Sequence, residues 1–237
     1  MPASVEIQPD ARHLELYTVR LRYDLSVTRD AGDLSVNTDP AVLASIRAEV
    51  ERACAAPTNA FGYGIWTHHI VSVVSFGREL SARLGADAEI VELAALLHDY
   101  AGIRNASLAA EHHRHSADDA RRLLGALDYP PCRTERVAAC IVTHRASQGL
   151  EPETLEARCL ASADAAAHIL QVPSLLHLAY VTKGLSIGEG AGWVRAKLER
   201  SYQKLCPEAK GLIETRYRAA LEMLECSNYR AYQMILL

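Results

Sequence analysis

The spacing of apolar positions changes once along this chain, between residues 27 and 39. Within 14–27, LELYTVRLRYDLSV, apolar residues alternate with polar ones, and a period of two predicts a half-buried β-strand. A lone strand is unstable, so we expect it to pair with another segment of this chain or of a second subunit. The sequence therefore predicts a short β-like arm at residues 1–38 rather than a separate folded domain.

From residue 39 the apolar positions recur at steps of three and four, the spacing of amphipathic helices, with Asp39 and Pro40 suited to the first helix start. Residues 39–237 are expected to form one all-α domain. Residues 99–115 are expected to be a loop with room for one short helix, and Thr134 to cap the helix after it. The predicted helices cover approximately 39–55, 66–84, 87–98, 116–127, 134–144, 153–171, 174–183, 190–205 and 207–225.

Composition excludes several classes of protein. The chain has 237 residues, of which 49% are hydrophobic and 23% charged, so it is globular rather than disordered. The net charge of −4 argues against a nucleic acid polymer as the main partner, because phosphate-binding surfaces usually carry a basic excess. No apolar run reaches the roughly 18 residues of a membrane span, and no signal-peptide pattern is visible. We therefore expect a cytoplasmic protein that does not contact a membrane.

Histidines and aspartates interrupt the apolar faces of the predicted helices. His69 shares a helical face with Val73 and Phe76, so it is expected to face the core. The other members of this set are His98, Asp99, His112 or His113, His144 and Asp164. Two inward aspartates would repel each other and would be costly to bury unpaired, whereas a divalent ion would remove that cost. Imidazole and carboxylate together suit Mn, Fe, Ni, Co or Zn.

These residues give the sequence a resemblance to the HD-domain superfamily of metal-dependent phosphohydrolases. The H…HD…D pattern of that family is matched by His69, His98, Asp99 and Asp164. The segments around them resemble successive blocks of one bacterial branch, in order: HHIVSVVSFGREL, EIVELAALLHDYAGI, EHHRHSADDARRLL, CIVTHRAS and LEARCLASADAAAHIL. The likeness covers residues 58–226, whereas the first 55 residues match nothing in the family. It implies an HD-domain helical bundle.

The resemblance also implies which residues bind metal. In the family an apolar residue follows the first ligand by four positions, which selects His69 over His68. Extra histidines are expected at His112, with His113 a close alternative, and at His144. They bind a second ion in two-metal members, where the aspartate of the HD pair bridges, and can hold the substrate phosphate in single-metal members. We therefore expect one or two divalent transition-metal ions, with the ligands His69, His98, Asp99, His112, His144 and Asp164.

The activity implied by the family is hydrolysis of a phosphate ester or anhydride on a small molecule, such as a nucleotide or a similar metabolite. A metal-activated water would be the nucleophile, and Asp99 is expected to orient it. Arg145, next to His144, is the first choice for a group that takes up phosphate charge during catalysis. Further candidates for substrate binding are Arg104, His113, His68, His168 and Tyr100.

Two other functions stay open at the level of sequence. Some HD proteins activate O₂ with a mixed-valent di-iron centre, so an oxygenase acting on a small molecule would use the same six ligands. A regulatory module that binds a nucleotide or a metal without turnover is a further alternative, although an intact ligand set argues against it. The arm at residues 1–38 suggests a dimer contact, and we expect a homodimer.

Overall fold

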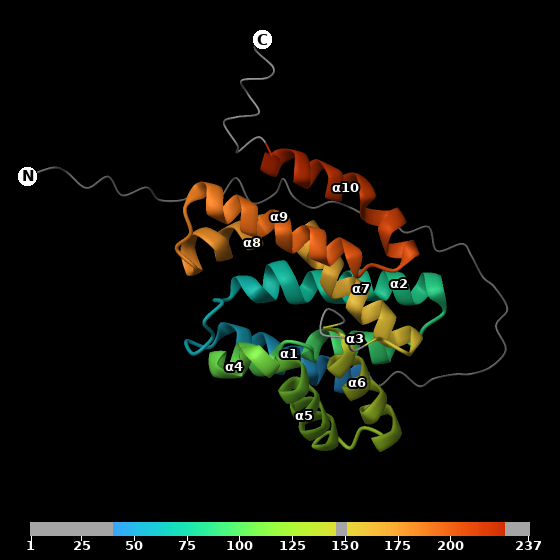
Figure 1. Ribbon diagram of the computed structural model, residues 1–237. Helices are drawn as coiled ribbons and strands as arrows, with labels where there is room; N and C mark the ends of the chain where they lie inside the picture. The colour runs from blue at the N-terminus through green and yellow to red at the C-terminus, as the bar shows by residue number, and fades with distance from the viewer. Residues whose placement is uncertain (1–39, 146–150, 226–237) are drawn as a thin grey trace, which may run out of the picture. The chain divides into compact units, whose positions relative to one another are not determined.

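The computed structural model describes residues 40–145 and 151–225, and these two ranges contain helices and no β-strand (Figure 1). The all-α prediction is confirmed for this part of the chain. The predicted strand at 14–27 lies outside the described residues, and both it and the boundary between the arm and the domain stay predictions. The α-helices are α1 Pro40–Ala55, α2 Val71–Leu84, α3 Ala88–Leu97, α4 Tyr100–Arg104, α5 His112–Gly125, α6 Pro131–Thr143, α7 Leu155–Leu170, α8 Val172–His177, α9 Ile187–Gln203 and α10 Pro207–Glu225.

Three shorter turns of other helix types join these elements. They are the π-helical turns η2 Trp66–Ile70 and η5 Leu178–Thr182 and the 3₁₀-helix η3 Ala106–Glu111. The turn η2 runs directly into α2, so the predicted helix at 66–84 exists but begins with a π turn. π-Helical turns are rare in proteins overall, but many of those that occur lie at functional sites. The extra residue changes the direction in which nearby side chains point.

Two local predictions were wrong. The segment 99–115 is almost entirely helical, because α4, η3 and the first residues of α5 follow one another with little loop between them. The helix predicted to begin at Thr134 begins instead at Pro131, a residue whose fixed φ and missing N–H suit the first turn of a helix. Thr134 therefore lies inside α6 and does not cap it.

Helix α7 occupies the middle of the bundle. It packs against α2, α3 and α6, and also against α8, α9 and α10 (Figure 1). Six of the 16 residues of α7 are alanines, and their small side chains let neighbouring helices approach closely. Gly77 of α2 also allows close approach of the helices, since a Cβ there would lie 3.1 Å from Cγ1 of Val91 and 3.7 Å from Cβ of Ala163.

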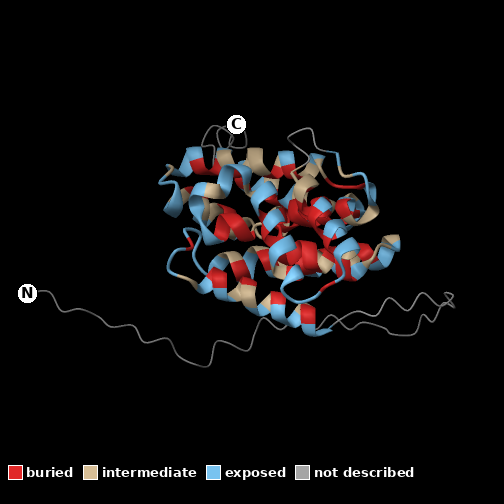
Figure 2. Ribbon diagram, turned by 90° about the horizontal axis from the view of Figure 1, so that it is seen from below, coloured by how far each residue is buried: buried red, intermediate tan, exposed pale blue. Residues whose placement is uncertain are grey.

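The buried apolar residues form two clusters. Figure 2 marks the buried residues along the helices in red. The larger cluster joins α1 through α7 and includes Ile46, Leu93 and Leu160, all at most 1% exposed. The second joins α7 to α9 and α10 and includes Val194 and Leu198, both fully buried. Helix α7 contributes to both clusters, so the polar residues on it lie between two water-excluding cores.

A buried ionic network ties the start of α3 to α6. Arg133 lies 2.6 Å from Oε2 of Glu89 and 3.0 Å from Oδ2 of Asp87, and the hydroxyl of Tyr129 donates to Glu89 at 3.0 Å. Asp87 also caps α3, because its carboxylate accepts a hydrogen bond from the N–H of Ile90. The network fixes the beginning of α3, whose other end carries the HD pair.

Within the described ranges no single helix has both the length and the apolar character of a membrane span. The helices Leu155–Leu170 and Val172–Thr182 meet that criterion only when they are taken together, and a bend of 75° separates them.

Candidate metal centre

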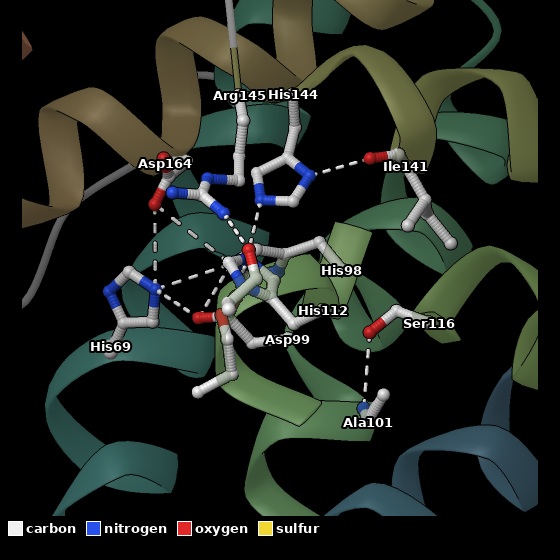
Figure 3. Close-up of polar contacts among 12 residues, drawn as sticks. His69, His98, Asp99, Ala101, His112, Ser116, Ile141, His144, Arg145 and Asp164 are labelled. Atoms are coloured by element: carbon white, nitrogen blue, oxygen red, sulfur yellow. Dashed lines mark hydrogen bonds and ion pairs between the residues drawn. The ribbon is translucent and has the colours of Figure 1, made fainter. Parts of the chain in front are cut away.

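Six of the predicted residues come together although they are remote in sequence (Figure 3). Each stands at the end of a helix or on an inward helix face: His69 in η2, His98 after α3, Asp99 before α4, His112 at the start of α5, His144 after α6 and Asp164 in the middle of α7. The helix ends place short polar side chains at the edge of the apolar clusters, where they project into a common space without displacing core residues.

The first half of this cluster is built around two carboxylates. Nε2 of His69 lies 3.3 Å from Oδ2 of Asp99, 3.5 Å from Oδ1 of Asp164 and 3.2 Å from Nε2 of His98. Nε2 of His98 lies 3.3 Å from the same Asp99 oxygen and 3.9 Å from Asp164. The other three groups of the H…HD…D pattern therefore lie around Nε2 of His69.

The second half of the cluster uses the other oxygen of Asp99. Nε2 of His112 lies 3.0 Å from Oδ1 of Asp99 and 3.2 Å from Nε2 of His144. Asp99 thus stands between two pairs of histidines, with one oxygen directed to each pair. This is the arrangement of a carboxylate that bridges two neighbouring cation sites.

Backbone hydrogen bonds fix the orientation of three of the imidazoles. Nδ1 of His98, His112 and His144 donates to the carbonyl oxygen three residues earlier, at 2.8, 2.8 and 2.6 Å respectively. In the neutral ring this leaves the Nε2 lone pair free to accept, and each Nε2 points into the cluster. Metal-binding histidines characteristically use their second nitrogen in this way.

These donor atoms fit a divalent transition metal. Nitrogen and oxygen ligands bound at about 2.0–2.2 Å, at tetrahedral to octahedral angles, lie roughly 2.8–3.6 Å from one another. Most contacts in the cluster fall within that interval, and the ligand atoms of two overlapping groups lie within 4.8 Å of one another: His69–His98–Asp99 and Asp99–His112–His144. The site therefore has the donor types and the spacing for two neighbouring ions.

The protonation states show how strongly these groups act on one another. Burial alone would raise the pKa of Asp99, but the positive charge of His98 and hydrogen bonds from His112 and His69 hold that pKa well below its ordinary value. Burial would lower the pKa of His98, but attraction to Asp99 raises it to about 9. Asp99 is therefore ionised and available as a ligand.

The two histidines of the second half are pushed in opposite directions. Burial and the nearby charge of His98 lower the pKa of His144 to about 3. For His112, burial would lower the pKa, but the hydrogen bond and charge of Asp99 raise it. Without a bound cation, one proton on His112 removes the repulsion between the lone pairs of the two facing nitrogens. His144 then stays neutral, which is the form that binds metal.

Two cavities open from the cluster. The larger, of about 780 Å³, is lined by aromatic and aliphatic side chains, among them Phe61, Leu178 and Trp193, and reaches His69 and Asp99. The smaller, of about 320 Å³, is lined almost entirely by polar groups and includes Asp99, His112, His144 and Asp164. A molecule with one apolar part and one charged part matches this pair of cavities.

Three basic residues, two in α9 and one directly after it, line these cavities and were missed in the sequence. Lys197, Arg200 and Lys204 line the smaller cavity, and the first two line the larger one as well. Their spacing of three and four residues places them on one helix face, a signal that was present in the sequence. What the sequence did not show was that this face is turned toward the HD pair. Burial lowers the pKa of Lys197, although Asp164 acts against that shift.

The predicted substrate-binding residues divide into two groups. Arg145 lines the smaller cavity, where it also donates to the carbonyl of Ala110 at 2.6 Å. His68 lines the larger cavity, and His168 lines both. The other three are engaged outside the linings of these cavities. The Arg104 guanidinium pairs with Asp119 at 3.0 Å, the Tyr100 hydroxyl donates to Glu49, and His113 is buried behind His112.

The sequence left open which histidine of each adjacent pair, His68–His69 and His112–His113, is the ligand. The surroundings of the side chains distinguish them. His112 reaches Asp99, whereas Nε2 of His113 lies 4.0 Å from Glu111 and its Nδ1 has no hydrogen-bond partner among the described residues. His69 faces the carboxylates, whereas His68 is exposed and its Nδ1 lies 2.7 Å from the hydroxyl of Thr67. The geometry favours His69 and His112 as ligands.

The fold and this centre define a helical bundle with histidines and aspartates converging at its core, and comparisons with known proteins name the family. The HD domain family matches residues 66–168, the span from the turn that carries His69 to His168 near the end of α7. These residues therefore form an HD domain, as the resemblance in sequence implied. No curated protein matches the chain.

Solved structures show the same fold at low sequence identity. A protein described as a predicted HD superfamily hydrolase, from an uncultured Thermotogales bacterium, is 21% identical, with a TM-score of 0.51 over 77% of this chain and 89% of that one. YpgQ of Bacillus subtilis is 19% identical, with a TM-score of 0.59 over 80% of this chain and 96% of its own. YpgQ in complex with ADP is similar over 77% and 94% of the two chains, with a TM-score of 0.57.

Proposed function

We propose that this protein is a metal-dependent hydrolase that acts on a phosphate ester or anhydride of a small molecule, such as a nucleotide or a related metabolite. The observation that carries this proposal is the position of Asp99. One of its oxygens faces His69 and His98, and the other faces His112. The smaller cavity opens directly beside it, with a basic wall formed by Arg145, Lys197, Arg200 and Lys204. A cation site next to a cluster of positive side chains is suited to a phosphorylated substrate.

The residues divide into ligands and phosphate-binding groups. We assign His69, His98, Asp99 and Asp164 to one ion, and His112, His144 and Asp99 to a second ion. When bound, divalent ions supply Lewis acidity, which lowers the pKa of a water molecule and neutralises charge on a phosphoryl group. Because both oxygens of Asp99 face imidazoles, Asp99 would be shared by the two ions.

The basic wall would bind and orient the substrate. Lys197 and Arg200 line both cavities, so they stand where a phosphate group in the smaller cavity meets an organic group in the larger one. Lys204 and Arg145 line the smaller cavity alone and would hold further phosphate oxygens. The apolar lining around Trp193 would exclude water from the organic part of the substrate.

A bound relative supports this choice of substrate. YpgQ, whose fold is similar, has been crystallised with ADP, a small molecule that combines an apolar base with two phosphate groups. A molecule of this kind suits the two cavities of the present chain by size and polarity. The predicted homodimer and the predicted cytoplasmic location stay predictions.

The test is release of phosphate or pyrophosphate from a panel of nucleotides and phosphate esters by protein loaded with Mn²⁺, Co²⁺, Ni²⁺ or Zn²⁺. We expect turnover of at least one phosphorylated compound and its loss in Asp99→Ala. The matched control is Asp118→Ala, an exposed aspartate on the same bundle that pairs with Arg121. If no metal supports turnover of any compound, the hydrolase assignment fails.

The second candidate is an oxygenase with a mixed-valent di-iron centre. The observation that favours it is the shared carboxylate between two histidine pairs, because two neighbouring ions are what such chemistry requires. The basic wall of the smaller cavity favours the hydrolase. Protein purified without oxygen would distinguish them: two irons per chain together with substrate-dependent O₂ consumption would support the oxygenase.

A further inference from the structure

His168 stands beside the metal centre and has no counterpart in the H…HD…D pattern. It lies one helical turn after Asp164 on the same face of α7, and its Nε2 is 3.8 Å from Oδ1 of that residue. Its ring stacks on that of His69, with centroids 5.3 Å apart and an angle of 24° between the planes. The side chain is only 13% exposed and lines both cavities.

One ring nitrogen of His168 lies near a hydrogen-bond partner, and the other is directed at a carboxylate. Nδ1 is 3.2 Å from Oγ of Ser201, a residue of α9 that is 2% exposed. Nε2 is directed at Asp164 Oδ1, the oxygen that also faces Nε2 of His69 and His98. A ring anchored at Nδ1, with Nε2 directed to a carboxylate, is the arrangement already described for His98 and His112.

His168 therefore completes a third group of candidate donors. Ligand atoms of His69, Asp164 and His168 all lie within 4.8 Å of one another, the same limit that His69–His98–Asp99 and Asp99–His112–His144 satisfy. Asp164 is the hub of this group, since its oxygen faces both imidazoles. The group shares His69 with the group His69–His98–Asp99.

We propose that His168 is a further protein ligand of the ion held by His69, His98, Asp99 and Asp164. The inference rests on the proposed metal site but goes beyond it, because it gives that ion three imidazole ligands. Ser201 is then a positioning residue: its hydroxyl oxygen accepts the Nδ1–H of His168, so that the Nε2 lone pair faces the ion.

The opposing arrangement is chemically distinct and can be observed. If the Ser201 hydroxyl donates to Nδ1, the proton of His168 lies on Nε2, and the ring then donates to Asp164 without binding the ion. The two arrangements differ in which nitrogen carries the proton. NMR detection of the imidazole nitrogens in protein labelled with ¹⁵N-histidine separates them in the intact chain, without any substitution.

The experiment is a titration of the metal-free, labelled protein with Zn²⁺, followed through these nitrogen resonances. We expect the Nε2 resonance of His168 to move together with those of His69 and His98, while Nδ1 of His168 stays protonated. A His168 ring that keeps its proton on Nε2 while His69 and His98 respond overturns this inference and leaves the proposed metal site intact. If no histidine responds to Zn²⁺, the metal site and the inference both fail.

Substitutions give an independent measurement by calorimetric titration with Zn²⁺. His168→Gln is expected to weaken binding by about 100-fold or more, since loss of an outer partner of a ligand alone costs about 10–100-fold. Ser201→Ala is expected to weaken it by roughly 10-fold through the lost anchor. His115→Gln, an exposed histidine on α5, is the matched control and should bind as the wild type does. Equal affinity of His168→Gln and the wild type would overturn the inference.

Discussion

The Nε2 atoms of His112 and His144 lie 3.2 Å apart, although Nδ1 of each ring is bound to a backbone carbonyl oxygen. Two neutral rings held in this way direct two lone pairs at each other. A shared proton relieves the repulsion in part, and a cation relieves it for both rings at once. The backbone therefore holds these two side chains in an arrangement that gains stability when an ion is added.

The first prediction follows from that gain. Mn²⁺, Co²⁺ or Zn²⁺ at 100 times its dissociation constant should stabilise the fold by about 2.7 kcal/mol. At roughly 2–4 °C per kcal/mol for a chain of this size, the midpoint of thermal unfolding should rise by about 5–10 °C. A chelator should reverse the shift. Differential scanning calorimetry of the wild type and of Asp99→Ala measures it, and a wild type that behaves like the variant would contradict the prediction.

The number of bound ions gives the second prediction. If Asp99 bridges two ions, the wild type should carry two per chain, and His144→Ala should carry one, because only the second half of the centre loses a ligand. Elemental analysis after dialysis against Mn²⁺ or Co²⁺ gives the ratio. His177→Ala, a histidine of the larger cavity outside the cluster, is the control and should keep the wild-type content. One ion in the wild type would show that Asp99 does not bridge.

The third prediction concerns the basic wall. Lys197→Met removes the charge and keeps most of the length of the side chain, so it should weaken substrate binding without removing the ions. A hydrogen bond to a charged group contributes about 1.5–3 kcal/mol, so kcat/KM for the substrate should fall about 10–150-fold. Steady-state kinetics and metal content, measured together, separate the two effects.

The control for this substitution is Lys210→Met. The ammonium of Lys210 lies 5.4 Å from the centroid of the Tyr202 ring, outside the linings of both cavities. Loss of that charge should leave kcat/KM close to the wild-type value. A Lys197→Met enzyme that turns over its substrate as well as the Lys210→Met enzyme would remove Lys197 from the binding site.

The fourth prediction concerns the dependence of stability on pH. The pKa of Asp87 is lowered, because hydrogen bonds and charge from Arg133 and Arg136 outweigh its burial. A carboxylate with a lowered folded pKa stabilises the fold above its unfolded pKa of about 3.9 and loses that contribution as the pH falls through the folded value. Asp87→Asn should therefore cost about 1–2 kcal/mol at pH 7.

Below about pH 4 the difference between wild type and Asp87→Asn should shrink, because the unfolded carboxyl takes up a proton there while the native carboxyl stays ionised down to its lower folded pKa. Asparagine keeps an oxygen that can accept from the N–H of Ile90, so the N-cap of α3 is retained and the charge alone is tested. Urea unfolding at pH 7 and at pH 3 gives the two free energies. An equal difference at both pH values would show that the carboxylate charge does not matter.

The sequence alone determined much of the local structure. Spacing of three and four predicted the helices α1, α2, α3, α7 and α10 close to their observed positions, because one buried face is enough to specify an amphipathic helix. It also placed His69 and Asp164 on inward faces, because their neighbours along those faces are apolar. The pattern of the HD pair then supplied the family, which needs only residue types and order.

The tertiary structure decided which of these faces meet. Periodicity within α9 does not reveal that Lys197 and Arg200 line cavities shared with Asp99, because that contact joins segments about 100 residues apart. The choice of His112 over His113 has the same origin. Both stand in the first turn of α5, and only the packing of α5 against α4 and α6 turns one toward Asp99 and buries the other. Local spacing specifies a buried face, and long-range packing decides what that face touches.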